Sequence, residues 1–237
     1  MLGKPSVLSG ISKDSIVFAG CRIPFASKVK NLGVTLDSAL SGKQQINTVC
    51  RACYVYIRQI FKIRKFLSQE SVVKLVSCFV LSRLDYCNSL LADLPTESIN
   101  KLQNVQNYAA CLVLGIRKCE YIIPALKNLH WLPISQRIHY KLSLLCYKSF
   151  SSLLPSYFSD FLSPYTVSCI LRSASDITKL SVPRHRLELY GKRAFPDLHL
   201  LSGTHCLLFS VKPTPQTLSK LTSELTFSAP SRPLCPA

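Results

Sequence analysis

The apolar residues in the middle of the chain recur at the spacing of an α-helix. From Ile46 they occupy positions 46, 49, 53, 57 and 60, and these steps of three and four residues place them on one helix face. A comparable stripe begins at Val72 and continues through Leu75, Val76, Phe79, Val80 and Leu84, and others begin at Ile99 and Ile138. Because each stripe needs a partner to cover it, the pattern predicts a compact array of helices joined by short loops over residues 41–162.

The expected helix ends carry their own signals. Ser68 is placed to cap the second helix and Ser135 the last long one, because a serine hydroxyl accepts a bond from a free N–H of the first turn. Gly115 is placed to end the third helix. A short helix is expected around residues 124–129, before a break at Trp131-Leu132-Pro133, and one further turn or two is expected over Tyr157–Leu162.

The two flanks follow other patterns. Short apolar runs between residues 15 and 36, punctuated by Gly20, Pro24 and Gly33, predict two or three strands in a small β-meander within residues 1–40. After Ser163 the periodicity decays, so residues 163–197 are expected to be an irregular extension and the proline-rich residues 198–237 a disordered tail. The fold class expected is α+β, mainly α.

The charge indicates a class of partner. Lys and Arg number 29 against 12 Asp and Glu, which gives a net charge of +17. Such an excess suits a polyanion such as RNA, although a merely basic protein is the plainer alternative. No charge-poor run reaches the roughly 18 apolar residues of a membrane span, so no membrane partner is expected. The eleven scattered cysteines predict reduced thiols in the nucleus or cytoplasm.

The basic side chains are concentrated in one stretch. Between Asp37 and Glu70 lie 32 residues without an acid, and aromatic residues are interleaved with the bases. Residues 51, 58, 62 and 65 share one helix face, which either binds phosphates or is simply a solvated surface. Two weaker sets follow, and Arg184 and Arg186 are weaker still. The predicted nucleic-acid contacts are Arg51, Arg58, Lys62, Arg64 and Lys65, then Arg117, Lys118, Arg137 and Lys141.

Catalytic and metal-binding patterns are weak. Two-metal nucleotidyl transfer needs paired carboxylates, but no two acidic residues are adjacent, and Asp85 and Asp93 are expected to be solvated or capping acids. Cys50 and Cys53 form a lone CxxC without further ligands at zinc spacing, so they are interpreted as small buried groups. The chain is expected to have no catalytic residues, no bound metal and no cofactor.

Four phrases of the sequence point to a family. They are NLGVTLDSAL (31–40), LSRLDYCNSLL (81–91), LQNVQNYAACLV (102–113) and LHWLPISQRI (129–138). In this order and at about these spacings they resemble the region downstream of the polymerase core in non-LTR (LINE-type, jockey-like) retrotransposon reverse transcriptases. The resemblance extends over roughly residues 1–195.

The resemblance implies a region that holds nucleic acid rather than one that reacts. The NLGVTLD-like segment follows the palm in this family, so Asn31–Asp37 would be a remnant of the palm-proximal hairpin. The helices beyond it correspond to the thumb, which grips the template–primer duplex. None of the matched positions is catalytic in the family. The chain is therefore expected to be a truncated fragment whose partner is RNA or an RNA–DNA duplex.

The resemblance breaks near residue 200. Family members usually continue after an Arg-Ala-Phe stretch to Leu-Trp-Asn-Ser-Leu-Pro, whereas here Arg193-Ala194-Phe195 leads to LSGTHCL at 201–207. If residues 201–207 are encoded by suitable codons, reading the same nucleotides one position earlier gives Leu-Trp-Asn-Ser-Leu-Pro, the family phrase. We hypothesise a frameshift between about residues 195 and 201. Third codon positions incompatible with the shifted reading would exclude it.

Two alternatives to a nucleic-acid-holding fragment stay open. One is a helical module that binds another protein, or the missing polymerase portion in trans, through partly exposed apolar stripes. The other is a relic of the mobile element whose product does not fold. An active enzyme ranks last, because no carboxylate constellation supports it.

Overall fold

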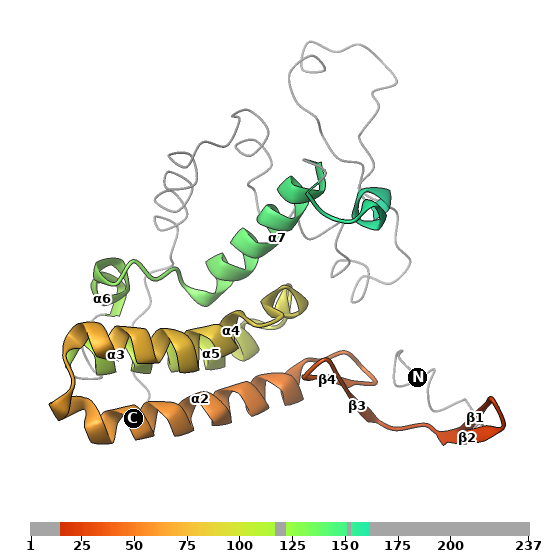
Figure 1. The fold of residues 1–237 in the computed structure, drawn as a ribbon, viewed down its shortest axis with the longest axis horizontal. Coiled ribbons are helices and arrows are strands. Elements are labelled where there is room, and N and C mark those ends of the chain that lie inside the picture. Colours follow the sequence, from red (N-terminus) through yellow and green to blue (C-terminus); the bar gives the residue numbers. More distant parts are fainter. Residues whose placement is uncertain (1–14, 117–121, 151–152, 162–237) are drawn as a thin grey trace, which may run out of the picture. The chain divides into compact units, whose positions relative to one another are not determined.

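The computed structural model describes residues 15–116, 122–150 and 153–161 (Figure 1). The chain divides into two compact units, one of residues 1–90 with 94–113 and one of residues 91–93 with 114–237. Helices predominate in the described part, and short antiparallel strands precede them. The predicted class, α+β and mainly α, is confirmed. The boundary between the units falls inside residues 41–162, the segment for which the sequence predicted one continuous helical array.

The first unit begins with two β-hairpins. Strand β1 (Ser15–Phe18) pairs with β2 (Cys21–Pro24), and β3 (Lys28–Asn31) pairs with β4 (Val34–Asp37). They form two separate two-stranded sheets, whereas the sequence predicted one meander of two or three strands. Both turns have two residues with positive φ, the geometry that closes a tight hairpin, and Gly33 is at 82° in the second. Each hairpin therefore closes on itself.

Helix α2 (Lys43–Ile63) follows and is tied to β4. The carboxylate of Asp37 accepts hydrogen bonds from the backbone N–H groups of Ser41 and Gly42, at 2.9 and 3.2 Å. The side chain of Gln45 in turn accepts one from the N–H of Thr35, at 2.9 Å. The two bonds to Asp37 satisfy N–H groups at the helix start that have no intrahelical acceptor, and the bond to Gln45 ties β4 to α2. The predicted helical face is confirmed, because Ile46, Cys53 and Ile60 are buried.

A second helical rod packs against α2. It consists of α3 (Gln69–Val76), a π-helical turn η2 (Ser77–Leu81) and α4 (Ser82–Asp85), after the 3₁₀ turn η1 (Arg64–Phe66). The hydroxyl of Ser68 accepts a hydrogen bond from the N–H of Ser71, so the predicted cap is confirmed. The stripe is correct at Val72 and Val76 but wrong at Phe79, which is 42% exposed. The wider π turn shifts the helical phase just there.

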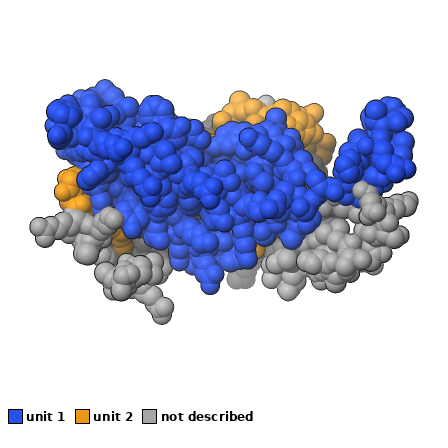
Figure 2. Space-filling view, turned by 90° about the horizontal axis from the view of Figure 1, so that it is seen from below, with its two compact units in different colours: residues 1–90, 94–113 blue, residues 91–93, 114–237 orange. Residues whose placement is uncertain are grey.

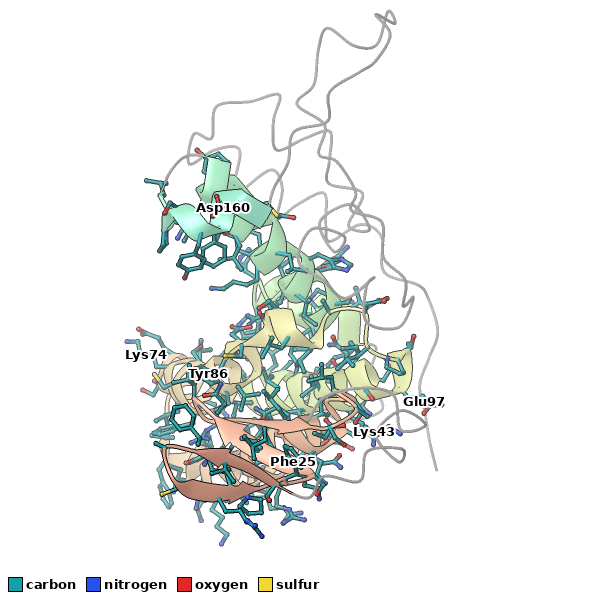
Figure 3. The ribbon with its side chains drawn as sticks, turned by 90° about the vertical axis from the view of Figure 1, so that its right-hand side faces the viewer. Phe25, Lys43, Lys74, Tyr86, Glu97 and Asp160 are labelled. Carbon is teal, nitrogen blue, oxygen red and sulfur yellow. The ribbon has the colours of Figure 1, made fainter. Side chains whose placement is uncertain are left out.

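The third helix of this unit is α5 (Thr96–Leu114), preceded by the short 3₁₀ turn η3 (Asn88–Leu91). Gly115 ends it with a φ of 69°, as predicted, because glycine enters this left-handed region without a steric penalty. Viewed along α2, Lys74 and Tyr86 mark the side of the α3–α4 rod and Glu97 the side of α5 (Figure 3). The core of the unit is built from Ile46, Cys53, Val72, Val76, Val80, Leu102, Val105, Ala109 and Val113.

The second unit contains α6 (Ile122–Asn128), α7 (Ile134–Phe150) and the 3₁₀ turn η4 (Ser156–Phe161), close to the predicted spans. Trp131 is buried in the predicted break, where its backbone N–H donates to the carbonyl oxygen of Leu126 at 2.9 Å. The prediction that Ser135 caps α7 is wrong. The helix already includes Ile134, so Ser135 lies inside its first turn, and the N–H of Arg137 bonds to the carbonyl of Pro133.

Several predictions lie outside the described residues. These are the irregular extension 163–197, the tail 198–237 and the hypothetical frameshift near residue 200. Within the described ranges, no helix combines the length and the apolar character needed to cross a bilayer.

Candidate nucleic-acid interface

Three basic side chains form a row on the outer face of α2. Arg51, Arg58 and Lys62 are all exposed and follow one another at steps of seven and four residues. The buried Cys53 and Ile60 lie on the opposite face of the same helix. The packing of α2 against the rest of its unit therefore turns this row outward. We call Arg51, Arg58 and Lys62 the α2 basic row, and Figure 2 views the first unit from the side on which α2 lies.

The chain around this row provides little negative charge. Residues 38–69 contain no acid, and the acids at the two ends of this stretch are already engaged. Asp37 bonds to the N-terminus of α2, and Glu70 forms an ion pair with Lys74 at 2.7 Å. The α2 basic row thus keeps its charge available for an external anion such as a phosphate.

The structure gives Arg64 a different position from the rest of its predicted set. Its guanidinium donates from Nε to the carbonyl oxygen of Leu112 and from Nη2 to that of Val113, both at 3.1 Å. Nη1 donates to the carbonyl of Leu67 at 3.2 Å. The first two acceptors are carbonyls of the last turn of α5, which has no helical donors left for them. Arg64 is therefore engaged with the protein itself, and we leave it out of the interface.

The interleaved aromatic residues divide into packed and exposed ones. Tyr54 meets Tyr108 of α5 edge to face, with ring centroids 5.7 Å apart. Tyr56 stacks on Phe79 of η2 with ring centroids 5.2 Å apart. The guanidinium of Arg83 lies 4.9 Å from the centroid of the Tyr56 ring. Phe61, in contrast, is 70% exposed at the end of α2. The two tyrosines thus join α2 to its neighbouring helices, and Phe61 does not share this role.

The sequence missed one residue of this surface. Phe66 in η1 is 76% exposed, and Lys65 Nζ lies 4.9 Å from the centroid of its ring. The phrase FKIRKF at 61–66, with an aromatic residue at each end and three bases between them, was the available signal. Lys65 is exposed, as expected, but it lies in η1 beyond the end of α2.

The weaker predicted contacts are placed elsewhere. Arg117 and Lys118 lie outside the described residues, as do Arg184 and Arg186. Arg137 and Lys141 belong to α7 in the second unit, so they form a set separate from the α2 basic row. The Nε of Arg137 donates to the carbonyl of Leu132 at 3.1 Å and so ties the Trp131 turn to α7. Lys141 is exposed.

The CxxC pair lies on the inner side of α2. Cys53 is fully buried, and its thiol lies 3.9 Å from the carbonyl oxygen of Val80 in the π turn. Burial raises the pKa of Cys53 to about 11 and also raises the pKa of Cys50. Because the thiolate is the metal-binding and nucleophilic form, both groups are poorly suited to either role. The interpretation of Cys53 as a small buried group agrees with its surroundings.

Two of the family-like phrases meet in space. The hydroxyl of Tyr86, from LSRLDYC, donates a hydrogen bond to the carbonyl of Leu32 in the NLGVTLD hairpin turn. A side chain added at Gly33 would come within 3.8 Å of the Tyr86 ring, so the turn and the ring are in close contact. Asp37, from the first phrase, anchors α2. These residues therefore have structural roles within the first unit.

The carboxylates that the sequence interpreted as non-catalytic are dispersed. Asp85 is exposed at the end of α4 in the first unit, and Asp93 is exposed with a φ of 54° in a residue group assigned to the second. Among the described residues, no three or more His, Cys, Asp and Glu side chains are grouped so that they could hold a metal ion. Comparison with protein-family models, curated proteins and solved structures found no match for this chain.

Proposed function

We propose that this chain is a catalytically incomplete fragment of a retrotransposon-type reverse transcriptase that holds RNA or an RNA–DNA duplex. The holding surface is the α2 basic row together with Lys65. The family assignment rests on the four sequence phrases, and the binding surface rests on the outward-facing row. Its binding is expected to be tolerant of sequence, because cations at this spacing contact the phosphate backbone rather than base edges.

The observation that carries the proposal is the position of Arg51, Arg58 and Lys62 on one exposed helix face. From the helical rise, the row is about 16 Å long, which covers several phosphates of one strand. It lies directly opposite the buried face of α2, so a bound backbone would not disturb the core. The absence of acids between residues 38 and 69 removes repulsion along this path.

Fluorescence anisotropy with a labelled RNA–DNA duplex tests the proposal. The full chain is titrated at several salt concentrations, and the slope of log K against log salt is compared between variants. Lys62→Glu removes a phosphate contact, so the affinity should fall and the slope should decrease by about one unit. Adding Arg58→Glu should lower both further.

Lys101→Glu is the matched control, because Lys101 is also an exposed lysine and its reversal changes the net charge equally. It lies on α5, not on the outer face of α2. Its affinity loss should be clearly smaller than that of Lys62→Glu. Equal losses would mean that overall charge, and not this row, attracts nucleic acid. Salt-independent binding, or no binding at low salt, would overturn the proposal.

One observation favours the second candidate, a protein-interaction module. The first hairpin presents apolar side chains to solvent from both strands, including Val17, Phe18 and Ile23. Strands β1 and β2 form a two-stranded sheet, so each has an edge that could pair with a strand of another protein. Such pairing would form through backbone hydrogen bonds, with the apolar side chains adding contact area.

The two candidates differ in their response to nuclease. A protein partner bound through the hairpin should remain bound to the chain after nuclease treatment. Phe18→Lys should abolish this binding, because it replaces a bulky apolar side chain with a charged one. Lys62→Glu should leave that association unchanged. If the partner is released by nuclease, or is lost equally in both variants, the hairpin is not the interaction surface.

A further inference from the structure

The turn at the end of α2 combines exposed rings with exposed cations. Phe61 and Phe66 are 70% and 76% exposed, and Lys62 and Lys65 lie between them in the sequence. Scattered apolar side chains on a surface need no explanation. Two phenyl rings within six residues, each next to a lysine, are a concentrated feature rather than a scattered one. We call Phe61, Lys62, Lys65 and Phe66 the aromatic–basic turn.

The protein fixes the backbone of this turn. Arg64, between the two lysines, is bonded to the end of α5 and to the carbonyl of Leu67. The N–H of Leu67 bonds back to the carbonyl of Arg64 at 3.2 Å, and Ser68 then caps α3. The rings are thus carried by an ordered backbone. A ligand that binds them does not have to order the turn first, which lowers the entropic cost of binding.

The chemistry of the turn suits a flat aromatic group attached to an anion. Lys65 Nζ lies 4.9 Å from the centroid of the Phe66 ring, yet most of that side chain stays exposed. A nucleobase has a π-face that stacks on such a ring, and its flanking phosphates match Lys62 and Lys65. Bases in the interior of a duplex are already stacked on their neighbours. The ligand that can use both features is therefore an unpaired nucleotide.

We infer that the aromatic–basic turn binds unpaired nucleotides of a single-stranded segment, with bases stacked on Phe61 and Phe66 and phosphates on Lys62 and Lys65. This inference rests on the proposed function and deepens it, because the turn continues the α2 basic row beyond Lys62. A line of cations leading to two rings matches a linear polyanion that passes from paired to unpaired nucleotides. It is less suited to an anionic membrane, which would need a broader cationic surface around the rings.

Binding of the full chain to a short oligouridylate tests the inference, beside an RNA–DNA duplex of equal length. Phe61→Ala with Phe66→Ala should weaken oligouridylate binding about tenfold or more, from the value of base–aromatic stacking. Duplex binding should change less than about twofold, since phosphate contacts dominate there. Phe66→Trp should preserve or strengthen oligouridylate binding, because the larger ring also stacks.

Phe18→Ala is the matched control, because Phe18 is also 70% exposed but belongs to the first hairpin. It should leave oligouridylate binding unchanged. If the double variant binds both ligands as tightly as the wild type, or binds both more weakly by the same factor, the inference is overturned. The proposed duplex binding by the wild type then still stands. If the wild type binds neither ligand, the proposed function fails as well. Binding to phosphatidylserine vesicles that requires the two rings, without an effect on oligouridylate, would overturn the inference in favour of a lipid surface.

Discussion

The side chain of Arg64 joins the end of α2 to the end of α5 through the carbonyl oxygen of Leu112, which accepts a hydrogen bond from Nε at 3.1 Å. A cation at this place also opposes the partial negative charge at the C-terminus of α5. A residue that sequence alone placed among the phosphate contacts thus holds two helices together. Its neighbours Lys62 and Lys65 remain exposed.

Replacing Arg64 should therefore lower stability more than it lowers nucleic-acid binding. Arg64→Met keeps much of the aliphatic stem but removes all three hydrogen bonds of the guanidinium. The free energy of unfolding should fall by roughly 1–3 kcal/mol, because bonds to charged donors are stronger than neutral ones and carbonyls are left without partners. Urea denaturation followed by circular dichroism measures the change.

Arg58→Met is the control for this prediction. Arg58 is exposed on α2, so its loss should alter the free energy of unfolding by no more than about 0.5 kcal/mol. It should, however, weaken duplex binding and reduce its salt dependence. The assignment of roles would be wrong if the two variants lost stability equally, or if Arg64→Met caused the larger loss of binding under conditions where it is folded.

The contrast between these arginines indicates what the sequence could predict. The helical face through Ile46 and Cys53, the cap at Ser68 and the stop at Gly115 all follow from neighbouring residues, and all were predicted correctly. The two acceptors of Arg64 in α5 lie 48 and 49 residues along the chain, beyond any local pattern. Arg58 and Arg64 look alike in the sequence, and the tertiary contact alone separates them.

The errors at Phe79 and in the strands have similar causes. A stripe of constant helical period puts Phe79 inside, but the π turn at Ser77–Leu81 changes the period there. The short apolar runs of residues 15–36 correctly predicted strands. Which strands pair with one another, however, depends on the conformation of the turns between them. Positive φ at both residues of each turn closes two hairpins where one meander was expected. The sequence likewise could not show which of Tyr54 and Phe61 is packed, because the partner of Tyr54 is Tyr108 in α5, 54 residues along the chain.

The bonds made by Asp37 predict a loss of stability in acid. Desolvation raises the pKa of its carboxyl, but the hydrogen bonds from Ser41 and Gly42 together outweigh it, so the net pKa lies below 3.8. A carboxyl with a lowered folded-state pKa stabilises the fold above its unfolded pKa. That contribution is lost as the pH falls through the folded-state pKa. The start of α2 should therefore become less stable below about pH 4.

Comparison of the wild type with Asp37→Asn tests this prediction. At pH 7 the variant should unfold at a lower urea concentration, because the amide is a weaker acceptor for the two N–H groups. As the pH is lowered to about 3, the difference should shrink, since the wild-type carboxyl is becoming protonated. Asp160→Asn, at an exposed carboxyl outside the first unit, is the control. A difference that stays constant from pH 7 to pH 3 would contradict the role given to Asp37.

The cysteines should differ in their reaction with an alkylating reagent. Burial raises the pKa of Cys53 to about 11 and that of Cys146 to about 12, so both are almost entirely thiols at pH 8. Only the thiolate attacks iodoacetamide. Brief native labelling followed by mass spectrometry should modify the exposed Cys21 and Cys78 first. Labelling in denaturant should make all four react alike.

The result also tests the interpretation of the CxxC pair. If Cys53 is a buried core group, added zinc should not change its protection or the stability of the fold. Cys53→Ala should leave nucleic-acid binding unchanged in the folded variant. Rapid native labelling of Cys53, or its protection only when zinc is present, would show that the thiol is accessible and would contradict the structure.

The single tryptophan, Trp131, reports on the second unit directly. It is 8% exposed, so its emission should lie at shorter wavelength in native buffer than in denaturant and should resist quenching by acrylamide. Leu142→Ala, at a side chain 2% exposed on α7, should destabilise the unit by roughly 2–5 kcal/mol and shift the fluorescence transition to lower urea. Leu153→Ala, at an exposed leucine, should not. Native emission identical to that in denaturant would show that the second unit does not fold, and would contradict the burial of Trp131 in the structure.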